Sequence, residues 1–461
     1  MDKNTIIGFV LIAAVLFGYS WFTKPTPEQL QELQRRNDSI AQVEQKKLEE
    51  IQQSQMVAGN ADSTITVLNE DSLRQVQMKE AFGIFSDFTT GENEKINLKN
   101  DLVSLSFSSK GGALTEATLN KYKTHDSLPL TLFDEKDNEY GFIFKTGGRI
   151  VNTTDLFFKP IAGKDGKSVT MRLDFGNGKF FDLVYTLPED SYMVKMDIRQ
   201  KGMETILPGN TASLDLFWNQ NLRSQEKGRM FEERNSALYY KFVGSDVDHL
   251  SESKDEQETI SLGLKWIGYK NQFFSSALIP DGKFNGALIR SGMNNDPAYL
   301  KNFHTETTVD YNPADNNGPG FRFYLGPNLY PLLHSYDKGV DDDKALDLDK
   351  LVPLGFKFFR WINTWIIIPI FTFLGKYIAN YGIIILLMTI IIKIFLAPLT
   401  FKSYMSSARM RVLRPQIEEI NAKYPGQDKA IDRQRATMDL YSKAGINPMS
   451  GCLCYCRCRF Y

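Results

Sequence analysis

Cysteine is missing from almost the whole chain. Of its 461 residues four are cysteines, and all four lie within the last ten residues: Cys452, Cys454, Cys456 and Cys458. No disulfide framework therefore holds any domain together. Their one-residue spacing also departs from the C-x₂₋₄-C grouping of zinc ligands, so we predict no metal site there.

Catalytic motifs are missing as well. The chain has no HExxH and no GxSxG, and its four histidines have no partners at ligand or relay spacing: His125, His249, His304 and His334. The stretch "GKDGKS" (163–168) has two residues between its glycines where a phosphate loop needs four, which favours a hairpin turn. We predict no catalytic residue, no cofactor and no enzymatic activity. A formal net charge of -1 also gives no sign of nucleic-acid sequence recognition.

Long apolar runs are present near both ends. The first, Ile6 to Phe22, measures about 25 Å as a helix at ~1.5 Å per residue, enough for a transmembrane anchor over residues 1–23. A cleavable signal peptide is the alternative, because Gly18 and Ser20 are small residues near the end of the run. The bulky aromatic pair that closes the run favours the uncleaved anchor.

Polar and alternating patterns fill the middle of the chain. Residues 24–81 are rich in Gln and Glu and predict a solvated tether. From 82 to 343 the apolar period becomes two, as in "LVSLSFSSKGG" (102–112) and "YMVKMDIRQKG" (192–202). Many such runs between glycine-rich turns predict a large antiparallel β sandwich.

An acidic joint and an aromatic, basic helix follow at residues 344–380. Two stripes run along this helix, one polar (Lys357, Arg360, Thr364) and one aromatic (Phe358, Trp361, Trp365). That pattern is typical of an amphipathic helix lying in the membrane interface. A second span is the alternative, since residues 365–374 are strongly apolar; Pro369 and the short length of the run favour the interfacial helix.

Residues 381–400 form the longest apolar run, and a charge interrupts it. The run predicts a transmembrane helix, yet it contains Lys393, and a charge near the centre of such a helix costs roughly 2.5–3.5 kcal/mol on insertion scales. The next charged residues are all basic up to Arg414, so the positive-inside bias places this end in the cytoplasm. With the anchor, this gives a multi-pass protein whose two termini are cytoplasmic and whose β domain lies outside.

The pattern of residues 401–445 predicts a cytoplasmic α-hairpin. Apolar residues recur at three and four on the first arm (Met410, Leu413, Ile417, Ile420, Tyr424) and on the return arm (Ile431, Met438, Tyr441). The turn is "PGQD" (425–428), and basic residues outnumber acidic ones. Two interpretations stay open: a solvated hairpin beside anionic lipid, or a contact for a nascent chain, a targeting factor or the ribosome.

Several stretches together resemble the YidC-type membrane protein insertases of bacteria with an outer membrane. In the β domain they are "LSFSSKGGALTEATL", "LKWIGYKNQFFSSALIP" and "FRFYLGP". The most specific are "IIIKIFLAPLTFKSYMSSARMRVLRPQIEEI" and "LYSKAGINPMSGC". The resemblance covers essentially Met1 to Cys452. It implies an inner-membrane insertase and chaperone for integral membrane proteins, without a covalent step. It also implies that the β domain is a periplasmic β super-sandwich.

The resemblance also implies a site. Family members place a cation of the first core span in a hydrophilic groove that is open to the cytoplasm and to lipid, and the matching residue here is Lys393, where many relatives have arginine. Thr389 lies one turn earlier on the same face. Snorkelling is the alternative, because Thr400 is only about 10 Å further along the axis. Hairpin contacts are expected from four cations: Arg409, Arg411, Arg414 and Lys423.

The implied partners are nascent membrane proteins and the lipid bilayer, with the Sec translocation channel, a targeting factor and the ribosome as further candidates. Family members continue into further core spans, whereas residues 446–461 end "CLCYCRCRFY". A reading-frame slip, a truncation or a sequencing error would account for this ending, and these alternatives stay open. Because several helices are needed to shield Lys393, we predict that this polypeptide alone does not insert clients. Rescue of insertase-depleted cells would contradict that.

Two other function classes stay open at this stage. A membrane-tethered carbohydrate-binding or carbohydrate-processing protein would have a cleft in residues 82–343, lined by paired carboxylates, aromatics and a histidine. A structural anchor would only present the β domain to a partner such as the translocation channel. The insertase interpretation needs no such cleft and places the function in the membrane half.

Overall fold

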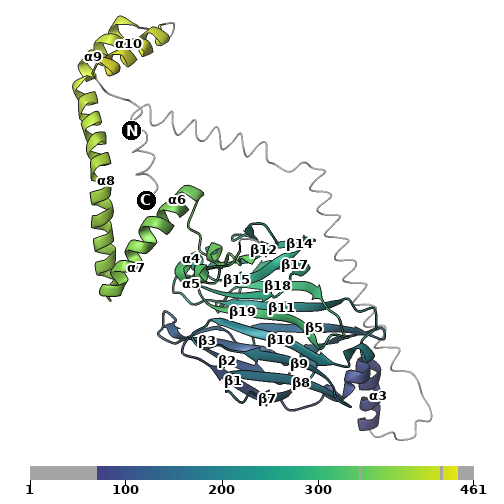
Figure 1. The fold of residues 1–461 in the computed structure, drawn as a ribbon. Helices are drawn as coiled ribbons and strands as arrows, with labels where there is room; N and C mark the ends of the chain where they lie inside the picture. Colours follow the sequence, from purple (N-terminus) through teal and green to yellow (C-terminus); the bar gives the residue numbers. More distant parts are fainter. Residues whose placement is uncertain (1–69, 342–343, 426–428, 445–461) are drawn as a thin grey trace. The chain divides into compact units, whose positions relative to one another are not determined.

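The computed structural model describes residues 70–341, 344–425 and 429–444 (Figure 1). The predicted anchor, most of the predicted tether and the cysteine-rich end lie outside the described residues. The chain divides into two units, and helix α3 (Glu70–Phe82) belongs to the first, which ends at Ser86. The short 3₁₀ helix η1 (Gly83–Phe88) crosses that boundary, and all the strands belong to the second unit.

The strands form a four-stranded and a fifteen-stranded sheet, and every described pairing is antiparallel. The smaller sheet has the order β1-β2-β3-β4, with β1 (Lys95–Lys99), β2 (Val103–Ser108), β3 (Leu114–Lys123) and β4 (Pro129–Phe133). The larger runs β6-β5-β11-β18-β17-β15-β16-β19-β10-β9-β8-β7, with β12, β13 and β14 attached beside it. The predicted large antiparallel β domain is therefore confirmed.

The bounds of the remaining elements of this domain follow in chain order. The strands are β5 (Asn138–Thr146), β6 (Arg149–Asn152), β7 (Lys159–Ala162), β8 (Ser168–Gly176), β9 (Lys179–Thr186), β10 (Met193–Lys201), β11 (Ser213–Arg223), β12 (Ala237–Phe242), β13 (Val247–His249), β14 (Glu256–Ile260), β15 (Leu264–Lys270), β16 (Phe274–Pro280), β17 (Phe284–Met293), β18 (Tyr299–Asp310) and β19 (Asn317–Pro327). The helices are η2 (Thr153–Asp155), η3 (Met203–Thr205), α4 (Arg229–Arg234), α5 (Tyr330–Ser335) and η5 (Leu348–Leu351).

Alternation of side chains decides which face of each strand is buried. On β10 the residues Val194, Met196 and Ile198 are buried, as their period of two predicts. On β2 the same holds for the apolar residues, but Ser108, expected on the outer face, is buried. Its hydroxyl donates to Asn93 Oδ1 at 2.6 Å, which satisfies the polar group at a point where the alternation ends.

The larger sheet packs one of its halves against the other. Phe142 on β5 packs on Phe321 of β19, with ring centroids 5.7 Å apart, although five strands separate β5 from β19 in the sheet. Phe144, also on β5, meets Phe181 on β9 at 5.1 Å in an edge-to-face pair. Aromatic pairs of this geometry add to the energy of area burial. The apolar core therefore lies between the two halves.

A buried hydrogen-bond chain ties the smaller sheet to this core. The hydroxyls of Tyr140 and Tyr185 lie 2.6 Å apart; Tyr185 donates to the carbonyl of Gly112, and Tyr140 accepts from the backbone N–H of Leu114. Both rings are fully buried, and burial raises the pKa of Tyr140 well above its ordinary value. Each buried hydroxyl has its partner, as the low dielectric requires.

Gly112 of the "KGG" turn reaches this chain with a left-handed backbone, φ +62°. A Cβ at this position would stand 2.9 Å from the ring of Phe158. Gly148, in the turn between β5 and β6, has φ +79° and no atom near its missing Cβ. Replacing either glycine by alanine therefore carries the cost of a positive φ, and only at Gly112 does the new Cβ also clash with a neighbouring side chain.

Three lysines are buried in the same domain: Lys241, which pairs with Asp347, and Lys270 and Lys301, whose ammonium groups bond backbone carbonyls. Lys270 Nζ donates to the carbonyl of Asn235 at 2.6 Å, and Lys301 Nζ donates to the carbonyls of Ser236 and Glu252 at 2.8 and 2.9 Å. Burial lowers the pKa of Lys270 to about 8 and also lowers the pKa of Lys301. Backbone carbonyls thus replace the water that these two ammonium groups lose.

The helical part begins with a continuous apolar helix. It is built from α6 (Lys357–Ile362), a π-helical turn η6 (Asn363–Ile367) and α7 (Ile368–Tyr377), and residues 358–377 are long and apolar enough to cross a membrane. Pro369 has no N–H group to donate, yet it does not break the helix. In the π turn directly before it, the N–H of Ile368 donates to the carbonyl of Asn363, five residues back instead of four, and this wider turn accommodates the proline. The short apolar run and Pro369, which favoured an interfacial helix, therefore do not make this helix too short for a span.

Three further helices complete the described chain. They are α8 (Tyr381–Val412), α9 (Arg414–Lys423) and α10 (Ala430–Lys443). The second apolar stretch that meets the requirements for a span is 381–398, within α8. The expected division at residue 400 is not a helix end, since α8 runs unbroken from the apolar stretch into the basic segment.

We expect Gly112→Ala to lower the unfolding midpoint of the full chain more than Gly148→Ala does. Both variants carry the positive-φ cost of about 1–2 kcal/mol, and Gly112→Ala adds an overpacking cost of roughly 1–3 kcal/mol. Thermal unfolding in detergent, followed by circular dichroism, measures the difference. Equal losses would contradict the clash with Phe158.

Stability of the β domain should also depend on Lys270 at alkaline pH. The unfolded chain keeps this proton up to its ordinary pKa of 10.5, while the folded chain releases it near 8, so this group makes stability rise with pH between those values. Relative to Lys270→Met, the wild-type unfolding midpoint should increase from about pH 7 to about pH 9. The exposed lysine variant Lys283→Met is the control, and a wild-type curve parallel to that of Lys270→Met would rule the effect out.

Candidate functional site

Helix α8 carries both predicted groove residues. Asn380 caps its first turn, since Asn380 Oδ1 accepts from the N–H groups of Gly382 and Ile383 at 2.9 and 3.4 Å. The helix has 32 residues, about 48 Å at ~1.5 Å per residue, whereas a hydrocarbon core of ~30 Å needs about 20 residues. The last three turns therefore extend beyond the hydrocarbon.

One face of α8 packs on α7. Ile384 is fully buried, and Leu387, Met388 and Ile391 are half-buried at the spacing of a single helix face. At the start of the helix Tyr381 stacks on Phe371 of α7, with ring centroids 6.2 Å apart and planes 12° from parallel. This face of α8 is the one that α7 shields.

The opposite face carries the polar residues. Lys393 lies nine residues after Ile384, about 180° around the axis at ~100° per residue, and Thr389 lies about 40° from Lys393. Both side chains are exposed. Gly382, Thr400 and Arg411 fall within about 40° of these two on the same helical wheel. We call these five residues the polar stripe.

Only two of these five residues, Thr389 and Lys393, were expected on this face, whereas Arg411 was expected as a hairpin contact. Spacings of 7, 11, 18 and 29 residues from Gly382 give nearly whole numbers of turns, and that recurrence of small and polar residues in an apolar run was the signal available. The structure brings Thr389 and Lys393 to one face, as the four-residue spacing predicts. It adds that this face is the one α7 leaves uncovered.

Hydroxyls on the stripe are satisfied inside the helix, and the ammonium is not. Thr389 Oγ1 donates to the carbonyl of Ile385 at 2.8 Å, and Thr400 Oγ1 to that of Ala397 at 2.9 Å. Such bonds let Thr lie in a lipid-exposed helix at little cost. Within the described part of the chain Lys393 has neither a hydrogen-bond nor an ion-pair partner, so its charge needs water or a bound group.

The hairpin is present, with one arm as expected and the other rotated. On the first arm Ile417, Ile420 and Tyr424 are half-buried between exposed neighbours, which matches the predicted face. On α10, Ile431 and Met438 are exposed at 74% and 54%, so the expectation that they face α9 was wrong. The half-buried positions there are Ala430, Arg433, Ala436, Thr437, Leu440 and Tyr441.

The four predicted hairpin cations are all exposed but do not form one patch. Arg409 and Arg411 are two residues apart, which places them about 200° apart around α8. Arg414 follows the bend at Leu413, where Pro415 cannot donate a helical bond, and Lys423 lies at the end of α9, 5.9 Å from the ring of Tyr424. The cations surround the end of α8 and do not line a single surface.

The β domain has a polar cleft of about 650 Å³. Its lining includes Asp137, Glu139, Tyr140, Asn219, Asn302 and His304. These are the residue types that the carbohydrate hypothesis requires. The histidine is already engaged, since His304 Nδ1 lies 2.5 Å from Asn219 Oδ1 and Nε2 lies 3.1 Å from Glu306 Oε1. No motif in the sequence joins His304 to these partners, because Asn219 comes from another strand and Glu306 lies only two residues away on the same strand.

One carboxylate of this cleft, that of Asp137, is paired with an arginine, which also holds the neighbouring Asp134. Arg223 contacts both Asp134 and Asp137. Burial raises the pKa of Asp137 even beside that guanidinium. Against the effect of burial, the backbone N–H of Lys136 and then Arg223 hold the pKa of Asp134 below its usual range. A carboxylate fixed by an internal arginine is a structural ion pair, and these residues do not form a poised acid–base couple.

Three acidic side chains lie together near the end of the β domain: Asp337, Asp347 and Asp349, with carboxylate oxygens within 4.8 Å of one another. Lys241 and Lys350 both bond Asp347, and the backbone N–H groups of Leu346 and Asp347 donate to Asp337 at 2.6 Å. Although burial opposes ionisation, Lys241 holds the pKa of Asp347 below its ordinary value. The two lysines thus pair with Asp347, backbone N–H groups satisfy Asp337, and burial raises the pKa of Asp349.

Comparison with known proteins identifies the family. A family model described as the YidC periplasmic domain matches residues 95–371, and one described as the 60Kd inner membrane protein matches residues 373–456. The chain is 50% identical over 454 residues to the membrane protein insertase YidC of Parabacteroides distasonis, and 41% identical over 464 residues to that of Porphyromonas gingivalis. Each match covers 98% of this chain and 72% of the relative. The chain belongs to the YidC family of membrane protein insertases.

Membership in the YidC family confirms the resemblance drawn from the sequence motifs. The protein is an inner-membrane insertase with a periplasmic domain, and its function is to insert membrane proteins, not to catalyse a covalent reaction. Nascent membrane proteins are accordingly its substrates. The carbohydrate alternative is not supported, although its expected cleft exists.

The rotated arm of the hairpin gives a direct test. We expect Ile420→Ala to speed amide hydrogen exchange in α10 several-fold, because a half-buried side chain between α9 and α10 is lost. Ile431→Ala should leave exchange in α10 unchanged, since this side chain points outward. Faster exchange in the Ile431→Ala variant than in Ile420→Ala would contradict the packing described for α10.

Proposed function

We propose that the polar stripe of α8 receives the polar and acidic parts of client proteins as they enter the bilayer. Lys393 supplies the charge, and Thr389 and Gly382 keep the path beyond it polar and narrow. The observation that carries this proposal is the position of an unpaired ammonium on the α8 face opposite α7. Thr389 lies about 6 Å from Lys393 along the axis, so a client segment would meet both residues.

The energies involved are of matching size. A client carboxylate at the centre of the bilayer costs roughly 2.5–3.5 kcal/mol on insertion scales. At about 4 Å and an effective dielectric constant near 20, its attraction to an ammonium is about 4 kcal/mol. One cation on the stripe can therefore offset most of the cost of one acidic residue. Since Lys393 is a point charge and not a planar fork, this attraction needs no bidentate geometry.

Snorkelling explains less of the pattern than the stripe does. A lysine that only stretches to the cytoplasmic surface needs neighbours on that side, such as Thr400. It gives no reason for Gly382 and Thr389 to continue the same face toward the other end of α8. The stripe over the whole helix therefore favours a path for clients.

We further propose that the helix of α6, η6 and α7 lies in the membrane interface and that both chain termini are cytoplasmic. The exposed cations after residue 400 favour the cytoplasm, and the β domain is periplasmic, so an odd number of crossings separates them. If α8 crosses, the helix before it does not. The match of the periplasmic-domain model through residue 371 supports this, and the exposed Trp361 and Trp365 suit headgroup depth.

We propose that the hairpin contacts a cytoplasmic partner, for which a targeting factor and the ribosome are candidates. The translocation channel is a candidate partner for another part of the protein. The extension of α8 beyond the hydrocarbon carries the start of α9 roughly 18 Å from its edge, further than a Debye length of about 8–10 Å. That distance weakens the attraction of Arg414 to anionic headgroups and favours a cytoplasmic partner.

Replacement of Lys393 tests the stripe. In the reconstituted full chain, photo-crosslinking from a benzoylphenylalanine at Leu386 to a client with an acidic tail should fall about tenfold or more in Lys393→Leu, a loss of at least ~1.4 kcal/mol. Lys393→Arg should retain crosslinking, because the charge stays on the same face.

A matched control keeps composition and depth constant. The double variant Lys393→Ile with Ile394→Lys moves the charge by about 100° around α8 and by ~1.5 Å along it. We expect it to crosslink as poorly as Lys393→Leu. Crosslinking at the wild-type level would show that only membrane depth matters, as snorkelling requires, and the stripe would be abandoned.

Topology has its own test. Protease added to spheroplasts should digest the β domain and leave α9 and α10 intact, since the hairpin would be cytoplasmic. Lysed cells serve as the control in which both are cleaved. Cleavage of the hairpin in intact spheroplasts would mean that α6–α7 and α8 both cross, and the interfacial helix would be rejected.

A further inference from the structure

Four large apolar side chains are exposed on adjoining segments of the β domain. They are Met230 and Phe231 of α4, at 67% and 66%, Phe273 in the turn between β15 and β16, and Leu329 before α5, both at 48%. Single exposed apolar residues are ordinary, whereas a group of them marks an interaction surface. We call these four residues the apolar foot.

Hydrogen bonds hold the three segments of the apolar foot together. Asn271 Nδ2 donates to Glu232 Oε1 at 2.7 Å and so joins the β15–β16 turn to α4. The backbone N–H of Asn328 donates to the carbonyl of Phe273 at 2.7 Å, and its side chain donates to the carbonyl of Asn271 at 3.0 Å. The three segments that carry the four apolar residues are therefore fixed to one another.

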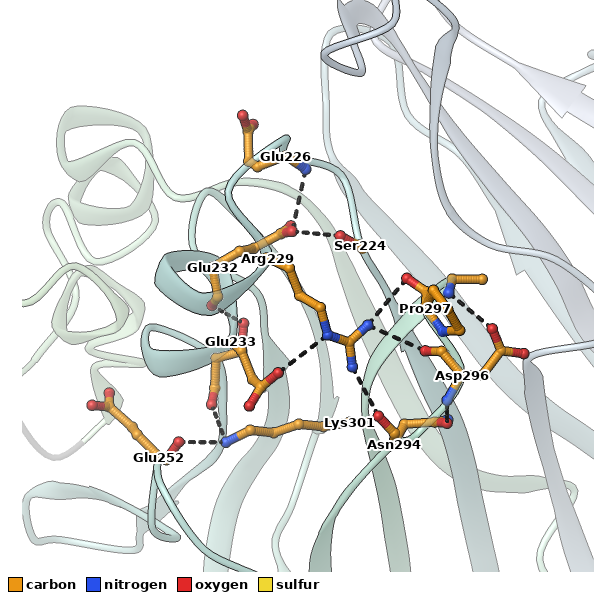
Figure 2. A network of polar contacts seen from close by, with 12 residues as sticks. Ser224, Glu226, Arg229, Glu232, Glu233, Glu252, Asn294, Asp296, Pro297 and Lys301 are labelled. Carbon is orange, nitrogen blue, oxygen red and sulfur yellow. Dashed lines mark hydrogen bonds and ion pairs between the residues drawn. The ribbon is translucent and has the colours of Figure 1, made fainter.

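Helix α4 is anchored from its polar side (Figure 2). Arg229 donates to the carbonyls of Asn294, Asp296 and Pro297 at 2.8, 3.2 and 3.1 Å, and the fully buried Glu232 accepts from the backbone N–H groups of Gln225 and Glu226. A helix of six residues has no stability of its own. These contacts keep α4 formed while Met230 and Phe231 point away from the domain.

Charges around α4 are sorted by sign. The acidic residues turn inward, since Glu232 is buried and Glu233 pairs with Arg229 at 3.4 Å. The exposed charges that flank the apolar pair are Lys227 and Arg234. An apolar tip between cations is the composition that binds an anionic lipid surface, through burial of the apolar groups and attraction to headgroups.

The chain leaves the β domain close to this surface and enters the membrane helices within a few residues. Trp266 Nε1 donates to the carbonyl of Leu346 at 2.6 Å, and Leu348 and Leu351 are fully buried, so the chain is fixed to the domain up to Leu351. Residues 352–356 then lead to α6 and span at most about 20 Å. The domain is thus kept within reach of the bilayer at all times.

We propose that the apolar foot docks the β domain on the periplasmic leaflet, with Met230, Phe231, Phe273 and Leu329 entering the boundary between headgroups and acyl chains and with Lys227 and Arg234 on anionic headgroups. The occupant of this surface is therefore phospholipid. A second copy of the chain or another protein would bury the same side chains, and the experiment distinguishes these outcomes.

The test uses the full chain reconstituted into vesicles of phosphatidylcholine with phosphatidylglycerol. Phe231→benzoylphenylalanine should form lipid adducts on illumination, detected by mass spectrometry. Ile150→benzoylphenylalanine is the matched control, because Ile150 is exposed to a similar degree, at 69%, on edge strand β6. We expect roughly tenfold more lipid adduct at position 231, the factor that burial of one large apolar side chain supplies.

A charge-reversed variant completes the test. Lys227→Glu combined with Arg234→Glu should lower the adduct yield at position 231 several-fold on vesicles with phosphatidylglycerol and leave it unchanged on phosphatidylcholine alone. Unfolding midpoints equal to those of the wild type show that the domain stays folded. Adducts to protein in place of lipid, or equal lipid yields at positions 231 and 150, would overturn the proposal whatever the insertase activity.

Discussion

A polar group that loses water must find another partner, and this rule decides where the protein can place its charges. In the hydrocarbon of a membrane no solvent is available, so each N–H, carbonyl, hydroxyl and ammonium group must be satisfied by the chain or by a bound molecule. The hydroxyls of Thr389 and Thr400 meet the requirement with carbonyls of their own helix. Lys393 does not meet it within the described chain, which makes it the residue that a client, water or further protein must complete.

The β domain shows the same rule with the opposite result. Lys301 is fully buried, and its ammonium group donates to two backbone carbonyls. The ammonium group of Lys270 donates to one backbone carbonyl, and burial lowers its pKa. The acidic group around Asp347 is likewise closed by lysines. Charges that serve the fold therefore have protein partners. An unpaired charge on an apolar helix stands apart from all of these and indicates a role outside the fold.

Sequence periodicity predicted correctly which face of an element a side chain lies on, and it did not predict which residues that side chain contacts. The alternation on β10 and the four-residue spacing of Thr389 and Lys393 follow from backbone geometry alone, so both could be derived from the sequence. Ile431 and Met438 failed because two apolar stripes fit α10 and only packing with α9 selects one. The length of the α6–α7 helix was missed because a π turn, invisible in composition, accommodates Pro369. His304 and Arg223 have cross-strand partners that no local pattern contains.

The number of times the chain crosses the membrane links the two proposed membrane contacts, the interfacial helix of α6–α7 and the apolar foot. In the proposed topology the cations after residue 400 are cytoplasmic, so a single crossing separates the periplasmic domain from the hairpin. Residues 381–398 of α8, with mean hydropathy 2.3 against 1.4 for residues 358–377, are the better candidate for that crossing. The helix that does not cross would then lie along the same leaflet as the apolar foot. Both carry exposed aromatic side chains with exposed cations close by in the sequence. A leaflet that binds one of them has the chemistry to bind the other, and the five-residue connection at 352–356 keeps both at its surface.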